Sequence, residues 1–280
     1  MVSALQLKRR IKTAQNVSKT TRAMQMIAAS KLKRAQEAAL AQRPYVEKLT
    51  RISRRVRGLV PKESAHPYLS TQKQGTFLLV LSPDKGLCGG LIANLLSEFV
   101  RIPKSLAIVS VGKKIERYAA RGGNLIASFP FGTTLPPVDS VFPLVSLIDE
   151  YYTKGKVGTV HVLYAHFVSV FVQRATIATL LPITLAEQEQ DTLQPFSLFE
   201  PSIEDLLPSI LRRYLEVNVY QFLLESYLSE QAARMIAMHS ATDNAKEIIE
   251  ELTLAYNKVR QERITNEILD ISGATLYSYE

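Results

Sequence analysis

The sequence has little cysteine and no long apolar run. Its 280 residues include one cysteine, Cys88, which excludes an internal disulfide and a metal site built from several cysteines. No run of about 18 apolar residues, the length that crosses a bilayer, occurs. The first residues, MVSALQLKRRIK, lack the apolar core of a secretory signal, and a helical pattern starts by residue 5, which leaves no removable leader. A reduced, cytosol-like compartment fits these absences.

Helix-breaking residues are almost missing from the C-terminal part of the chain. Between Ser209 and Tyr277 there is no proline, and the only glycine is Gly273. Such an uninterrupted pattern is typical of a coiled coil, although an ordinary amphipathic core helix is the alternative. Apolar residues recur there at alternating spacings of three and four, which keeps one face toward a partner helix. This C-terminal stripe comprises Met235, Met238, Ala245, Ile249, Leu252, Tyr256 and Val259, with Thr242 at its one gap.

Acidic residues are scarce at the other end of the chain. Residues 1–57 hold 15 lysines and arginines against only Glu37 and Glu47, a net charge of +13, while the whole chain carries +8. This asymmetry indicates either a surface for an acidic or nucleic-acid partner or the solvated face of a long helix. The segment lacks the interleaved aromatic residues expected of a protein that binds single strands.

Residues 3–57 predict a second long helix, and Pro44, its first interior proline, would kink this helix or end its first part. A heptad seam runs through it, and many of its members are small enough to let two helix axes approach closely. If the middle of the chain returns to its starting point, the two terminal helices can pair antiparallel. The seam comprises Leu7, Ile11, Ala14, Ser18, Thr21, Gln25, Ala28, Leu32, Ala35, Ala39, Gln42, Val46, Leu49, Ser53 and Val56.

The middle of the chain alternates strand-like and helix-like segments, which predicts a mostly parallel sheet covered on both faces. The last two strands are close enough in sequence to form an antiparallel edge. The fold class is therefore α/β plus coiled coil, with a linker at 58–75, an α/β domain at 76–184, a loop at 185–208 and the C-terminal helix at 209–280. The expected strands are Thr76–Ser82, Ser105–Val111, Asn124–Phe129, Thr159–Phe167 and Phe171–Leu180, and the expected helices are Leu91–Arg101, Lys113–Arg121 and Val138–Lys154.

The most enzyme-like feature is the turn Ser82–Gly90, which follows a strand and opens a helix, where α/β sheets bind ligands. It matches neither of the nucleotide-binding motifs G-x-G-x-x-G and G-x-x-x-x-G-K-[ST]. Cys88 near a helix N-terminus would be a nucleophile only with a histidine base, and none of the four histidines lies near it in sequence. His161 and His166 point to opposite faces of their strand, which makes them a poor pair of metal ligands. A small-molecule enzyme is thus one hypothesis, and the one we favour is a tight turn in which glycines allow close packing. The turn's candidate residues are Asp84, Lys85, Gly86, Cys88 and Gly89.

Three stretches together resemble one family, the γ subunit of F-type ATP synthases. They are Ile11–Lys33, the DKGLCGG core of the turn, and Ser229–Ala274, which ends in ITNEILDISGA. Their order and spacing match over essentially the whole chain. Two features depart from the family: Leu276 replaces the usual small residue near the C-terminus, and the cysteine pair of the chloroplast redox switch is missing. The resemblance therefore implies a bacterial-type chain without thiol regulation.

The resemblance implies a central rotor shaft: an antiparallel left-handed coiled coil with a Rossmann-like α/β domain at its base. The implied partners are the α and β subunits of the α3β3 ring, the ε subunit and the membrane c-ring, on the cytoplasmic face of the bacterial inner membrane. Chemistry, nucleotide and Mg²⁺ would belong to partner subunits, so neither a cofactor nor catalysis nor direct membrane insertion is expected here. A coiled-coil nucleic-acid-binding protein is the alternative hypothesis. The implied contacts to the β subunit are Arg260, Gln261, Thr265, Met24, Lys19, Arg22 and Lys31.

Overall fold

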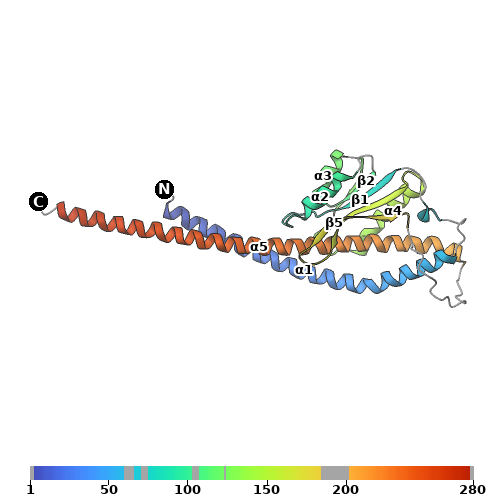
Figure 1. Ribbon diagram of the computed structural model, residues 1–280, viewed down its shortest axis with the longest axis horizontal. Coiled ribbons are helices and arrows are strands. Elements are labelled where there is room, and N and C mark those ends of the chain that lie inside the picture. The colour runs from blue at the N-terminus through green and yellow to red at the C-terminus, as the bar shows by residue number, and fades with distance from the viewer. Residues whose placement is uncertain are drawn as a thin grey trace. The chain divides into compact units, whose positions relative to one another are not determined.

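A computed structural model describes residues 3–59, 66–70, 75–102, 107–122, 124–183 and 202–277. The chain forms two compact units, one of residues 1–27 with 235–280 and one of residues 28–234. Two long helices, α1 (Ala4–Leu59) and α5 (Ile203–Tyr277), each contribute a segment to both units (Figure 1).

The first unit is a pair of helices. Its α1 and α5 segments run in opposite directions, with both chain ends at the same end of the pair (Figure 1). Every member of the predicted C-terminal stripe is buried or half-buried, and so are the six seam residues of α1 in this unit, from Leu7 to Gln25. Thr242, at the gap of the stripe, bonds to Thr21 of the seam at 2.8 Å between hydroxyl oxygens. The predicted antiparallel pairing of the terminal helices is therefore confirmed.

The second unit is built on a five-stranded sheet in the order β3-β2-β1-β4-β5. β1, β2, β3 and β4 are parallel, and β5 pairs antiparallel with β4 at the edge, as predicted. The strands are β1 (Thr76–Leu81), β2 (Ala107–Val111), β3 (Asn124–Phe129), β4 (Thr159–Phe167) and β5 (Gln173–Leu181).

Helices cover both faces of this sheet because its central strands are apolar on both sides. Leu78 and Val80 of β1 pack with buried residues of α2 and α3. On the other face, Phe77 of β1 meets Tyr151 of α4 edge-on, with ring centroids 5.8 Å apart. The covering elements are α2 (Leu91–Arg101), α3 (Lys113–Gly122) and α4 (Val141–Thr153), with the 3-10 helices η2 (Pro67–Leu69) and η3 (Val138–Ser140).

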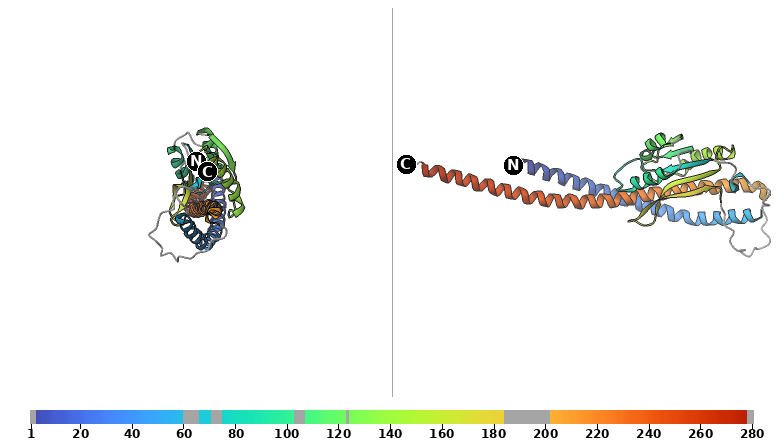
Figure 2. Two further views of the ribbon diagram at one scale, coloured as in Figure 1. Left: turned by 90° about the vertical axis from the view of Figure 1, so that its right-hand side faces the viewer. Right: turned by 45° about the horizontal axis from the view of Figure 1, so that its top comes forward.

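Within the second unit, α5 lies between the sheet and α1 (Figures 1 and 2). Ser229 of α5 donates to the carbonyl of Ala165 in β4 at 2.8 Å, and Ser226 accepts from the amide of the same residue at 3.4 Å. On the α1 side, Arg213 donates to the hydroxyl of Tyr45 at 2.9 Å. This segment of α5 is therefore covered on two sides, by the sheet and by α1.

Several predicted boundaries differ from the structure by one to three residues, and three larger differences concern the long helices and the linker. α1 continues through Pro44, because the proline lies on the exposed face while the seam on the opposite side stays covered. The predicted linker 58–75 contains η2 (Pro67–Leu69), whose Tyr68 is buried and donates to Asp149. α5 begins at Ile203 rather than 209, because Ser202 caps it by accepting from the amide of Asp205 at 3.2 Å. The rest of the predicted loop, residues 185–201, lies outside the described residues.

Candidate functional site

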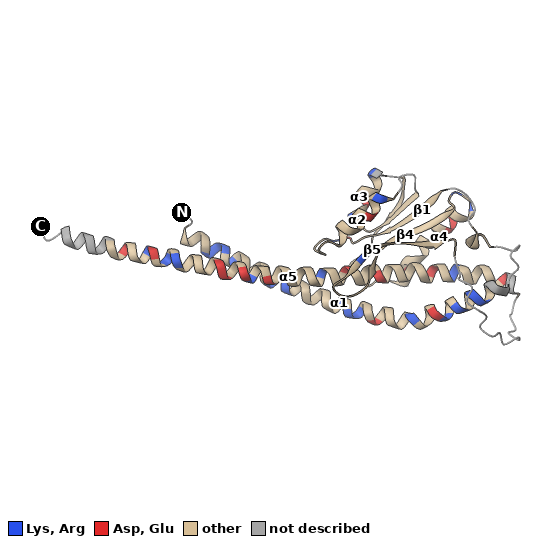
Figure 3. Cartoon of the chain, viewed as in Figure 1, with Lys and Arg blue, Asp and Glu red and all other residues tan. Residues whose placement is uncertain are grey.

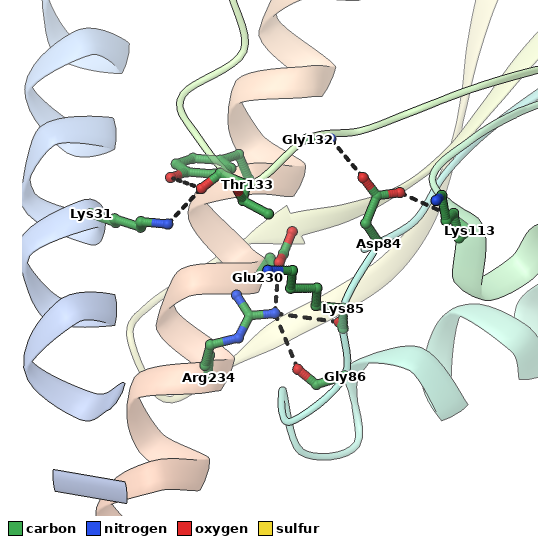
Figure 4. Close-up of polar contacts among 10 residues, drawn as sticks. Lys31, Asp84, Lys85, Gly86, Lys113, Gly132, Thr133, Glu230 and Arg234 are labelled. Carbon is green, nitrogen blue, oxygen red and sulfur yellow. Dashed lines mark hydrogen bonds and ion pairs between the residues drawn. The ribbon is translucent and has the colours of Figure 1, made fainter. Parts of the chain in front are cut away.

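The turn after β1 is held by the carboxylate of Asp84. One oxygen accepts from the amide of Lys113, the first residue of α3, at 3.0 Å, and the other from the amide of Gly132 at 2.8 Å (Figure 4). A carboxylate at a helix N-terminus satisfies an unpaired amide and is favoured by the helix dipole. Asp84 thus joins three segments at the carboxyl ends of parallel strands. In nucleotide-binding α/β folds, a phosphate group binds at this place.

Arg234 of α5 reaches the same turn. Its Nη2 donates to the carbonyls of Lys85 at 3.4 Å and Gly86 at 3.2 Å, and it pairs with Glu230 Oε1 at 2.7 Å (Figure 4). The side chains of Arg234 and Glu230 are only 15% and 5% exposed. Burial raises the pKa of Glu230, and the charge of Arg234 opposes that rise. Glu230 Oε2 has no hydrogen-bond partner within the part of the chain that the structure describes.

The neighbouring loop after β3 is held by both long helices. Lys31 of α1 donates from Nζ to the carbonyl of Thr133 at 2.6 Å, and the hydroxyl of Tyr227 of α5 donates to the same oxygen at 3.5 Å (Figure 4). The structure therefore brings Lys31 together with the turn residues, which the sequence placed in separate groups. Glu230, Arg234, Thr133 and Tyr227 were missed, and their only signal was a Glu–Arg spacing of four, which usually marks a surface pair.

Cys88 is buried, and burial raises the pKa of its thiol, while the charge of Arg234 lowers it less. A thiol in this state is a poor nucleophile. The geometry therefore favours the hypothesis of a structural turn over that of an enzyme with Cys88 as its nucleophile. Leu87 (φ 64°) and Gly89 (φ 57°) both take the left-handed conformation of a tight turn. A closer contact lies at Gly112 after β2, where a Cβ would lie 1.8 Å from the carbonyl oxygen of Ser82, whereas Gly86 has only ordinary contacts.

The predicted contacts to a β subunit lie on exposed helix surface, except Lys31, which is half-buried. Arg260, Gln261 and Thr265 are all exposed on α5, and the Thr265 hydroxyl bonds to the carbonyl of Gln261 at 3.0 Å. On α1, Met24 is 37% exposed, and its neighbours Lys19 and Arg22 are exposed as well. Basic residues follow α1 along its length, whereas α5 carries charges of both signs (Figure 3).

The described residues also bear on two other functions, metal binding and membrane insertion. No three histidine, cysteine, aspartate or glutamate side chains within the described ranges come together as a metal site would require. None of the helices in those ranges has the length and apolar character needed to cross a membrane.

The chain shares its fold, a long helix pair joined to an α/β domain, with chains of solved ATP synthase structures. It resembles the central stalk of the mitochondrial ATP synthase of Tetrahymena thermophila, with a TM-score of 0.60 at 22% identity over 79% of this chain and 99% of that one. It also resembles a chain of the Euglena gracilis mitochondrial ATP synthase, with a TM-score of 0.64 at 15% identity over 98% and 95% of the two chains. At these identities, the two structural similarities show a shared fold and nothing more.

Sequence comparison identifies the family. The family model described as ATP synthase matches residues 3–275. The chain is 41% identical to the ATP synthase gamma chain of Dehalococcoides mccartyi over 95% of its own length and 96% of that chain. It is 35% identical to the gamma chain of Legionella pneumophila over 98% of both. The chain belongs to the ATP synthase gamma-chain family.

Proposed function

We propose that this chain is the central rotor shaft of the F1 sector of a proton-translocating F-type ATP synthase. The observation that carries the proposal is the near-complete match to bacterial gamma chains, of which this chain covers 96% or more. The antiparallel helix pair and the α/β domain supply the two parts that such a shaft needs, one to enter a ring of subunits and one to stand at its base. No comparison favours the alternative of a nucleic-acid-binding protein.

The proposed mechanism follows from asymmetry. A single shaft presents a different face to each of three otherwise equivalent catalytic subunits at any one angle. Rotation then biases each β subunit in turn among its conformations, and it can do so only through contacts that differ between those conformations. The subunit would be non-catalytic, because nucleotide and Mg²⁺ would be bound by its partners.

The proposed partners are the α and β subunits of the α3β3 ring, the ε subunit and the c-ring. As an ATP synthase gamma chain, the protein belongs to a membrane-associated complex, and we place it on the cytoplasmic face of the bacterial inner membrane. Residues 76–184 would form the base, and residues 1–57 and 209–280 the shaft.

Arg260, Gln261 and Thr265 are the proposed polar contacts to a β-subunit loop, and their exposure on α5 leaves them accessible to such a partner. On the basic helix α1, the exposed Met24, Lys19 and Arg22 are proposed to meet acidic β-subunit segments. Lys31 is proposed there too, although its ammonium already donates to Thr133 within this chain.

Co-purification tests the function directly. The tagged chain, isolated from its source at moderate salt, should bring ATP-hydrolysing subunits in a ratio of three α and three β per copy. Recovery of the chain alone, or with nucleic acid that salt removes steeply, would contradict the proposal.

Substitution tests the contact residues. Arg260→Ala and Gln261→Ala should lower coupled ATP synthesis without changing the thermal stability of the chain, because both side chains are exposed. Arg263→Ala is the matched control, since Arg263 lies on the same helix and bonds only to Glu267 of that helix among its described contacts. If both variants synthesised ATP and assembled like the unmodified complex, the assignment of these contacts would fail.

A further inference from the structure

The C-terminal end of α1 carries a group of exposed basic residues. We call this group the basic end of α1, and Figure 3 shows the basic residues at this end of the helix. Its segment, residues 48–55, contains no acidic side chain, and the nearest acidic residues in the sequence are Glu47 and Glu63. The excess of positive charge in residues 1–57 therefore continues into the second unit. The members of the basic end are Lys48, Arg51, Arg54 and Arg55, all of them exposed.

Helical spacing places most of the basic end on one side of α1. Lys48, Arg51 and Arg55 follow one another at intervals of three and four residues, which brings their side chains onto one face of the helix. On the opposite face, Ser53 and Val56 are completely buried. The helix thus packs into the second unit through one face and presents its basic face to solvent.

The charge of this face is not neutralised within the described part of the chain. Lys48 and Arg51 form no ion pair with any residue in the described ranges. Arg54 and Arg55 also interact within the chain, and they add positive charge to the same surface. At the start of α5, by contrast, Arg212 and Arg213 both pair with Glu216. The basic end of α1 is therefore suited to an anionic partner.

The headgroups of anionic phospholipids fit this surface. Clusters of lysine and arginine beside a membrane are attracted to anionic lipids, and each residue typically strengthens binding about fivefold. Ile52, next to Lys48 and Arg55 on the helix surface, is 49% exposed. An apolar side chain among basic ones is typical of helices that lie at a lipid interface. The chain also belongs to a family whose members are part of a membrane-associated complex.

We propose that the basic end of α1 binds the phosphate headgroups of anionic phospholipids and so holds the base of the shaft against the membrane surface. The proposal rests on the proposed function as rotor shaft, in which the second unit stands toward the c-ring. Attraction to a lipid surface has no fixed partner atoms. The contact can therefore persist while the shaft turns.

One double variant and one matched control test the contact. Lys48→Gln with Arg51→Gln removes two positive charges from the basic end, and it should leave folding unchanged because both side chains are exposed and form no ion pair among the described residues. The control is Arg117→Gln with Arg121→Gln. These two arginines are exposed on α3 of the same unit, so the control loses the same charge at another place.

The measurement is co-flotation with lipid vesicles. The ATP-hydrolysing complex that contains the chain is detached from its membrane and mixed with vesicles of phosphatidylcholine, either alone or with about one third phosphatidylglycerol as the anionic lipid. The unmodified complex should float with the anionic vesicles and not with the neutral ones. Salt at about 1 M should release it, because the Debye length is then only about 3 Å. In the double variant the partition coefficient should fall about 10- to 30-fold, and in the control it should not change.

Three results would contradict the proposal, and they differ in what they overturn. Equal vesicle binding by the double variant and the control would overturn the lipid contact alone. Binding only to vesicles that contain purified c-ring would show that the surface takes a protein partner, which also overturns the lipid contact. If the unmodified chain never co-purified with ATP-hydrolysing subunits, the rotor function itself would fail.

Discussion

The hydroxyl oxygens of Thr21 and Thr242 lie 2.8 Å apart, in a hydrogen bond that joins α1 to α5 inside the paired helices. Each threonine occupies a position of the heptad pattern where an apolar residue is usual. Each hydroxyl also lies within hydrogen-bond distance of a carbonyl of its own helix, that of Val17 at 3.1 Å and that of Met238 at 2.7 Å. A polar pair at matching seam positions fixes the register of the two helices at some cost in stability.

Replacing these threonines by valine should show that the pair contributes to register more than to stability. Thr21→Val and Thr242→Val should each lower the free energy of unfolding by about 1 kcal/mol or less, because the remaining hydroxyl keeps a carbonyl acceptor. The double variant should be close to neutral, so the coupling energy in a double-mutant cycle should equal the sum of the two single losses, up to about 2 kcal/mol. Urea unfolding followed by circular dichroism measures all four free energies. Strict additivity would show that the hydroxyls do not interact.

Alanine at Gly112 should be far more damaging than alanine at Gly86. Gly112 has φ +99°, and its new Cβ would lie 1.8 Å from the carbonyl oxygen of Ser82. A strained residue of this kind costs about 1–3 kcal/mol before the steric overlap is added. At Gly86 the nearest atoms are the flexible end of Lys114 at 3.9 Å, so Gly86→Ala should change stability by no more than about 1 kcal/mol. Thermal unfolding of the two purified variants decides the comparison, and equal losses would contradict it.

The thiol of Cys88 should react slowly in the folded chain. It is 1% exposed, and burial raises its pKa, so little thiolate is present at neutral pH. Iodoacetamide should therefore add to the protein in urea and not in buffer, as followed by the mass of the intact chain. Rapid modification of the native protein would instead indicate an accessible, reactive cysteine.

Alkaline pH should weaken the second unit through its buried tyrosines. Burial, with the nearby charge of Glu225, raises the pKa of Tyr164 to about 12, and burial with the hydrogen bond to Asp149 raises the pKa of Tyr68. Because the folded state favours the neutral phenol, this contribution is complete below pH 10 and is lost as the pH rises from about 10 to about 12. Tyr164→Phe should flatten the fall of stability over that interval, as denaturant unfolding at several pH values would show.

The control for this pH effect is Tyr118→Phe, because Tyr118 is 46% exposed. It should leave the slope of stability against pH unchanged. A Tyr164→Phe chain whose stability fell as steeply as that of the unmodified protein would contradict the assignment.

Periodicity predicted most of the fold because it reports local burial. The seam of α1, from Leu7 to Val56, is buried or half-buried at every position, and β3 and β4 have the predicted bounds. The predicted start of α5 was wrong because the helix is capped at Ser202, before Pro208, and the pattern treated this proline as a break. The contact of Arg234 with the turn, across 148 residues of sequence, was missed because a local pattern carries no information on such a pairing. The contacts proposed for Arg260 and Gln261 stay predictions, since they concern another subunit.

The antiparallel helix pair also has a consequence for biosynthesis. Thr21 and Thr242 are 221 residues apart, so the partner of the first helix is made last. At a usual rate of about 5–20 residues per second, the ribosome needs roughly ten to forty seconds to bridge that interval. During this time the basic, apolar-striped N-terminus has no helix to cover it, and a chain that stops before Met235 never acquires one. The first helix of this protein is thus covered only when synthesis is complete. Truncated products keep an exposed apolar stripe, by which chaperones and proteases can distinguish them from the complete chain.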